Sequence, residues 1–134
     1  MGDVRTLLAF DFGEVRIGVA VGNTLTESAE PLCVLPSVPT QQRFDAIARL
    51  IAQWQPAALV VGRPLHPDGA PHQMTARCER FARQLAGRFG LPMHLVDERY
   101  SSVQALSDGA RPEQLDAQAA AIILRQYLAQ DPAR

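Results

Sequence analysis

A carboxylate at the end of the first apolar run is the side chain of this chain best placed to do chemistry. Asp11 closes the run 7–10 and opens the turn 11–16, after which a second apolar run begins at 17. An ionised carboxylate beside a buried sheet is costly unless a cation or a hydrogen-bond donor meets it. Asp before Gly also commonly starts a turn, so this segment alone leaves a structural role for Asp11 open.

Further carboxylates follow one later strand and occupy one helix. The apolar stretch 92–96 predicts a strand that runs directly into Asp97 and Glu98. The stretch 112–130 predicts a helix, because it begins with Pro and then contains no breaker. On that helix Asp116 lies opposite the polar stripe, so we expect it to face the protein. The alternative is that Asp116 only complements the dipole of the first helical turn.

Three carboxylates from three segments suit a divalent cation better than acid–base catalysis by one pair. Hard cations such as Mg²⁺ take oxygen ligands and commonly bridge to substrate phosphates. Two such ions about 4 Å apart are the usual nuclease arrangement for hydrolysing a phosphodiester. His66, His72 and His94 have no zinc-like spacing and do not compete with this interpretation.

The order of the expected elements places these acids at one edge of a sheet. We expect three strands, a helix, a strand, a helix, a strand and a last helix, at about 4–11, 15–22, 30–36, 40–54, 58–62, 72–89, 92–96 and 112–130. Thr40 is expected to cap the first helix, and Pro56 to end it. A meander followed by β-α-β units predicts an α/β fold with a mixed sheet flanked by helices. In such sheets reactive groups gather beyond the carboxyl ends of the parallel strands.

Composition limits the class of protein. The 134 residues fit one domain, 1–134, and the apolar share of 47% is that of an ordinary globular protein. Cys33 and Cys78 are too few for a disulfide framework, so we expect reduced core thiols and a cytoplasmic protein. No apolar run approaches the length of a membrane span, and we expect no membrane partner.

The charges are distributed unevenly along the chain, although the net charge is close to zero. All 13 basic residues are Arg, and the formal net charge is −1. The segment 63–111 carries seven Arg against five acids, between two acidic flanks. A local patch for phosphates and a solvated helix face explain this basic middle equally well.

Four motifs in chain order resemble the YqgF/RuvX family over nearly the whole chain. They are Asp11-Phe-Gly-Glu-Val-Arg16-Ile-Gly-Val-Ala20, Val61-Gly-Arg-Pro-Leu65 with Asp68-Gly69, Asp97-Glu98-Arg99, and Leu115-Asp116 through Ala119-Ala120 to Ile123-Leu124 and Tyr127-Leu128. The resemblance implies a ribonuclease H-like fold related to the RuvC Holliday-junction resolvases, with a five-stranded mixed sheet. It also implies a nuclease that processes the 5′ end of pre-16S ribosomal RNA.

The same resemblance implies roles for six residues. Asp11, Glu98 and Asp116 are then the catalytic acids that bind Mg²⁺ or Mn²⁺. Arg16 and Arg99 match motif arginines, and Arg63 stands in the Gly-Pro loop, so these three are expected to bind substrate. The expected partners are nucleic acid, with pre-16S rRNA first and branched DNA second, and a precursor of the ribosomal subunit.

One segment departs from the family pattern. The stretch 100–111 is shorter than in relatives, and Arg111 is its sole basic residue. A helix is expected to be truncated there, leaving one turn at 101–107. Fewer basic residues mean fewer phosphate contacts and weaker binding of nucleic acid.

Two other classes of protein compete with the nuclease. One is a binder of nucleic acid or of a ribosome precursor that keeps the fold without turnover. The other is an actin-like phosphate-binding domain, which the first hairpin also resembles. Such ATPases need a second copy of the domain to enclose a nucleotide, and 134 residues leave no room for it. Junction resolution in DNA repair is a further alternative within the nucleases.

Overall fold

The computed structural model describes residues 5–64, 73–98 and 112–130. Five strands form one sheet in the order β3-β2-β1-β4-β5. The strands are β1 (Thr6–Phe12), β2 (Arg16–Asn23), β3 (Ala29–Pro36), β4 (Ala58–Pro64) and β5 (Met93–Glu98). The first three are antiparallel neighbours, whereas β4 runs parallel to both β1 and β5. The mixed sheet predicted from the element order is therefore confirmed.

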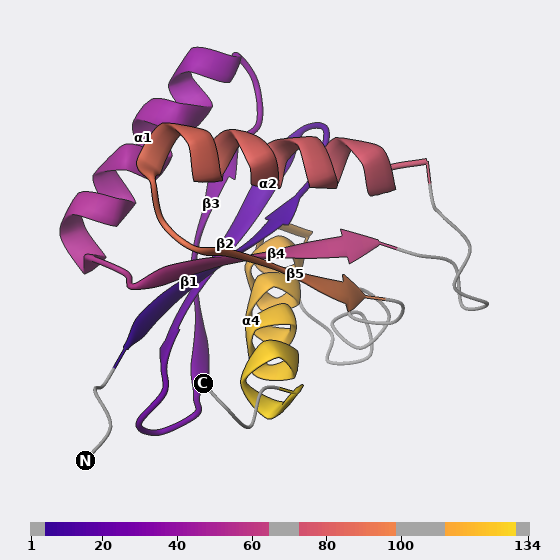
Figure 1. The fold of residues 1–134 in the computed structure, drawn as a ribbon. Coiled ribbons are helices and arrows are strands. Elements are labelled where there is room, and N and C mark those ends of the chain that lie inside the picture. Colours follow the sequence, from indigo (N-terminus) through magenta and orange to yellow (C-terminus); the bar gives the residue numbers. More distant parts are fainter. Residues whose placement is uncertain (1–4, 65–72, 99–111, 131–134) are drawn as a thin grey trace.

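Helices cover both faces of the sheet (Figure 1). The helices α1 (Thr40–Trp54) and α2 (Thr75–Phe89) pack on one face, and α4 (Pro112–Gln130) packs on the other. Each face has its own buried cluster, because strand side chains alternate between the two faces. Leu8 and Phe10 of β1 belong to the α1–α2 cluster, whereas Leu7 and Ala9 belong to the α4 cluster.

The ends of the first two helices follow from local residue chemistry, with two corrections. The expectation that Thr40 caps α1 is wrong, because Thr40 is already helical and the extended Pro39 is the N-cap. Helix α2 begins at Thr75 and not at 72, and the Thr75 hydroxyl donates to the Pro64 carbonyl at the end of β4. Gly90 ends α2 in the left-handed conformation, which glycine adopts more readily than other residues.

Strand β4 is longer than its apolar run. The sequence placed Arg63 in a loop, and this is wrong: Arg63 and Pro64 lie in the strand, in register with Asp97 and Glu98 of β5. Pairing with β5 therefore extends the strand past Gly62.

Two further expectations concerned the state of the cysteines and the presence of a membrane-spanning helix. Cys33 and Cys78 are both free thiols, and Cys78 is buried. Within 5–64, 73–98 and 112–130, no helix combines the length and the apolar character needed to cross a bilayer. The turn expected at 101–107 lies outside the described residues.

Candidate active site

The candidate site lies where β1, β4 and β5 end and β2 begins. Asp11 is the penultimate residue of β1, and Arg16 is the first residue of β2. Because β1, β4 and β5 are parallel, Asp97 and Glu98 lie at the same edge of the sheet as Asp11. The edge predicted from sequence is the one that the structure forms.

A close contact between helix α4 and strand β2 brings Asp116 to Asp11. Asp11 pairs with Gly18 across the first hairpin. A Cβ atom built on Gly18 would lie 1.8 Å from the backbone oxygen of Asp116. Only a residue without a side chain allows the helix backbone to lie this close to the strand. Asp116 therefore sits over the strand pair that carries Asp11.

The two carboxylates affect one another electrostatically. Burial, and then the negative charge of Asp116, raise the pKa of Asp11 from 3.8 to about 7. The prediction that Asp116 faces the protein is confirmed, since its side chain is only 26% exposed. The structure therefore joins two of the three expected acids.

Arg16 compensates one of these charges. Its Nε donates a 2.7 Å hydrogen bond to Oδ2 of Asp116, although the two residues are 100 positions apart in sequence. The Arg16 side chain is 46% exposed, so the ion pair with Asp116 is partly accessible to solvent. This arginine was expected to bind substrate, and in the structure it is also an ionic partner of the site.

The donor chemistry of the described acids fits a hard cation. Both Asp11 and Asp116 offer carboxylate oxygens, and a cation would offset both the burial and the repulsion from Asp116 that raise the pKa of Asp11. Among side chains that the structure describes, no three His, Cys, Asp or Glu residues form a metal-binding group. The Glu98 side chain and all of Arg99 lie outside the described part of the chain.

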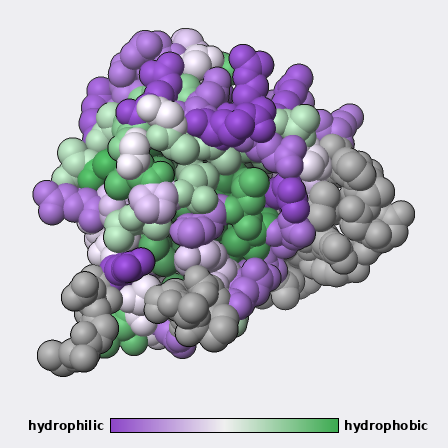
Figure 2. Space-filling view, in the orientation of Figure 1, coloured by the Kyte–Doolittle hydropathy of each residue, from purple (hydrophilic) through white to green (hydrophobic). Residues whose placement is uncertain are grey.

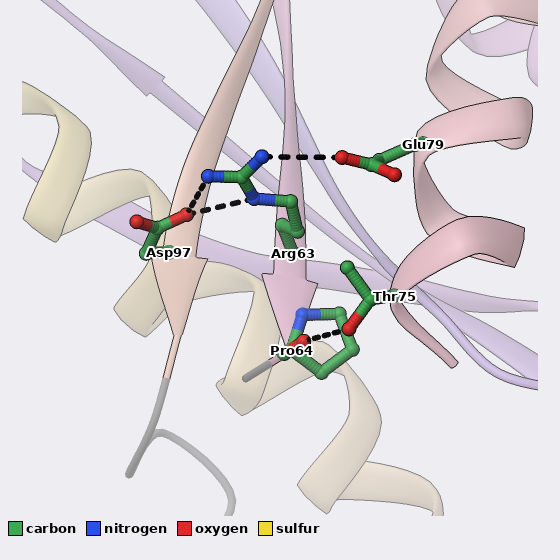
Figure 3. A network of polar contacts seen from close by, with 5 residues as sticks. All are labelled: Arg63, Pro64, Thr75, Glu79 and Asp97. Atoms are coloured by element: carbon green, nitrogen blue, oxygen red, sulfur yellow. Dashed lines mark hydrogen bonds and ion pairs between the residues drawn. The ribbon is translucent and has the colours of Figure 1, made fainter. Parts of the chain in front are cut away.

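Arg63 forms a second polar group at the same edge (Figure 3). Its Nε and Nη2 contact Oδ1 of Asp97 at 2.8 and 2.6 Å, and its Nη1 contacts Oε2 of Glu79 at 3.1 Å. These hydrogen bonds raise the pKa of Arg63. The sequence analysis missed Glu79, because a single acid on a helix carries no signal of a partner 16 residues away.

The strand order, the helices on both faces and the acid at the end of the central strand define a ribonuclease H-like fold. Solved structures agree. RuvC of T. thermophilus bound to a Holliday junction substrate matches with a TM-score of 0.56 and 20% identity, covering 92% of this chain and 93% of RuvC. The Fowlpox virus resolvase in complex with Holliday junction DNA matches with a TM-score of 0.56 and 7% identity, covering 92% of this chain and 97% of the resolvase.

The particular family follows from sequence comparison. The RuvX family model, described as Holliday junction resolvase, matches residues 5–130, so this chain belongs to the RuvX family. A relative from Paraburkholderia xenovorans is 56% identical over 131 residues, which cover 95% of this chain and 90% of the relative. A relative from Burkholderia pseudomallei is 58% identical over 127 residues, which cover 92% of this chain and 87% of the relative. Both carry the name "Putative pre-16S rRNA nuclease".

Proposed function

We propose that this protein is a metal-dependent nuclease that hydrolyses phosphodiester bonds at the 5′ end of pre-16S rRNA. The observation that carries the proposal is the meeting of Asp11 and Asp116 at the end of the central strand, where the pKa of Asp11 is raised to about 7. Two carboxylates that repel one another on a ribonuclease H-like sheet suit a divalent cation and hence phosphoryl chemistry.

The substrate and setting rest on the relatives. Proteins 56–58% identical to this chain are named for pre-16S rRNA, and this similarity extends over most of both chains. We place the activity in the cytoplasm, on RNA within a precursor of the ribosomal subunit. Branched DNA is the second substrate to test, because the RuvX family model is described as a Holliday junction resolvase.

Asp11, Glu98 and Asp116 would hold Mg²⁺ or Mn²⁺ in this proposal. Glu98 is included because of its place in the Asp97-Glu98-Arg99 motif, at the sheet edge that carries Asp11. Bound Mg²⁺ would polarise the phosphate and lower the pKa of the attacking water. The burial and charge that perturb Asp11 act in the same direction, since both favour binding of a cation at this carboxylate.

The arginines of the motifs would hold the nucleic-acid backbone. Arg16 is close to half exposed beside Asp116, so a phosphate at the acids lies within the field of its guanidinium. Arg63 has five N–H donors, and the three nitrogen contacts to Asp97 and Glu79 leave donors for a phosphate oxygen. Arg99 completes the proposed set through its place in the Asp-Glu-Arg motif.

The test is cleavage of a labelled pre-16S rRNA 5′ fragment with Mg²⁺, Mn²⁺ or EDTA. Wild type should cleave only with metal, and Asp11→Asn should lower the rate at least 100-fold, because one metal-binding charge is lost. Asp45→Asn is the matched control, since Asp45 is an exposed acid on α1, on the other face of the sheet.

Two results would overturn the proposal. Equal residual cleavage by wild type and Asp11→Asn would identify a contaminant and leave an RNA-binding protein without turnover. Cleavage of a four-way DNA junction with none of the RNA fragment would move the function to DNA repair.

A further inference from the structure

One buried cation on the α1–α2 face has no acidic partner in the described residues. Arg43 is 8% exposed, and its guanidinium lies 5.2 Å from the Phe12 ring and 4.8 Å from the Phe44 ring. It donates to the Ser37 carbonyl and to the Gln84 side chain, but its buried Nε has no hydrogen-bond partner. A buried charge without a counter-ion is costly, so its surroundings favour an added negative charge.

Two exposed arginines of α2 add to the same positive field. Arg88 lies over the Phe44 ring at 3.9 Å, so it shares that ring with Arg43. Burial, and then the charges of Arg88 and Arg80, lower the pKa of Arg43. We call Arg43, Arg80 and Arg88 the arginine face. Figure 2 shows hydrophilic residues gathered over the side of the molecule where α2 lies.

The acids near α2 are engaged elsewhere. Glu79 binds Arg63, and Glu14 binds Arg77 at 2.9 Å. Within 5–64, 73–98 and 112–130, no acid forms an ion pair with Arg80 or Arg88. The arginine face therefore keeps its positive charge, although the chain as a whole has a net charge of −1.

The arginine face lies on the α1–α2 face of the sheet, opposite the α4 face that carries Asp11 and Asp116, and at Arg43 it reaches the same sheet edge. Phe12, which lies under the Arg43 guanidinium, directly follows Asp11 in β1. Ser37, which accepts from Arg43, follows the end of β3, and Pro36 of that strand pairs with Arg16. A strand of nucleic acid that crosses this sheet edge from the acids at the end of β1 therefore reaches Arg43 first and then the exposed arginines of α2.

We infer that the arginine face binds the phosphate backbone of the single-stranded RNA on which the candidate site acts, with Arg80 and Arg88 making the contacts and Arg43 strengthening the field beneath them. The inference rests on the proposed function and names a surface for its substrate. Exposed arginines without counter-ions complement a polyanion, and phosphate contacts supply most sequence-independent affinity. Such a face offsets the short 100–111 segment, which carries Arg111 as its sole basic residue.

The test measures binding of a fluorescent single-stranded RNA in EDTA, by anisotropy over a range of NaCl concentrations. The variant Arg80→Gln/Arg88→Gln removes two charges from the arginine face. The matched control Arg49→Gln/Arg83→Gln removes two charges from other exposed positions of α1 and α2. Circular dichroism and thermal melting verify that both variants are folded.

Loss of two phosphate contacts should lower the slope of log K against log salt by about 1.4, or about 0.7 per contact with a single strand. Affinity at 0.1 M salt should then fall roughly 25-fold, while the control falls less than threefold. An equal loss of affinity in both double variants would assign the effect to total charge and overturn the inference. Unchanged binding by Arg80→Gln/Arg88→Gln would also overturn it. If wild type binds RNA through the arginine face but does not cleave it with Mg²⁺, the proposed nuclease activity is refuted, whereas the inferred RNA-binding surface is supported.

Discussion

Replacing Asp11 with Asn should stabilise the metal-free protein at alkaline pH. In the folded protein the pKa of Asp11 is raised from 3.8 to about 7, so ionising this side chain costs folding free energy. The sign follows from proton linkage. Below pH 3.8 Asp11 is neutral in both states and costs nothing, and as pH rises to 7 the unfolded chain loses its proton first. Stability is therefore lost between pH 3.8 and about 7, and the cost is complete above pH 7.

The magnitude of this stabilisation follows from the same shift in the pKa of Asp11. One pH unit corresponds to about 1.4 kcal/mol, so the ionised Asp11 lowers the free energy of unfolding by about 4 kcal/mol above pH 7. A partly buried Asn amide with incomplete hydrogen bonding costs about 2 kcal/mol in return. The net gain for Asp11→Asn is therefore about 2 kcal/mol at pH 8. For 134 residues this corresponds to a rise of about 7 °C in Tm.

The assay is urea unfolding of wild type and Asp11→Asn in EDTA at intervals from pH 5 to pH 8. The difference in unfolding free energy should grow by about 3 kcal/mol in favour of Asn over this range, because the Asn side chain does not titrate. Asp45→Asn should shift stability by no more than about 0.5 kcal/mol at any of these pH values, since Asp45 is exposed. A difference between wild type and Asp11→Asn that stays constant with pH would refute the electrostatic account of Asp11.

Four further predictions concern backbone packing, metal binding and an ion pair. Gly18→Ala should destabilise the protein by at least about 3 kcal/mol in urea unfolding and abolish cleavage, because the added Cβ overlaps the Asp116 backbone. Gly87→Ala, where a Cβ meets nothing within 4 Å, should stabilise α2 by about 0.5–1 kcal/mol. Mg²⁺ or Mn²⁺ at 100 times its Kd should raise the unfolding free energy of wild type at pH 8 by about 2.7 kcal/mol, and Asp11→Asn should lose this response in a thermal-shift titration. Arg63→Met should cost only about 1 kcal/mol in urea unfolding, because the side chain and its acidic partners are each at least one-third exposed.

Apolar runs and helix-breaking residues were sufficient to predict the order of the elements, but not the end of β4, the start of α2 or the polar pairings. The side chains of β1, β4 and α4 are mostly buried, so these elements appear in the sequence as apolar stretches. The order of the elements, and the sheet edge that carries Asp11, were therefore predictable. The ion pairs of Arg63 join residues 16 and 34 positions away, and no local pattern encodes such contacts. The sequence likewise gave no sign that Arg43 is buried, because exposure of a helical Arg depends on which neighbouring rings cover it.

Small residues on two facing elements explain how the fold holds two like charges together. Positions 18, 20 and 22 of β2 are Gly, Ala and Gly, and they face α4, whose buried residues there include Ala117, Ala120 and Ala121. The backbones of β2 and α4 are therefore buried against one another. The dispersion contacts between these two elements oppose the repulsion between Asp11 and Asp116. The helix cannot withdraw to relieve that repulsion without opening the packed interface along β2. The same packing that fixes the fold therefore holds the two carboxylates together. If the proposed function holds, Gly18→Ala should abolish cleavage, and Asp11→Asn should lower its rate at least 100-fold in a protein that is more stable.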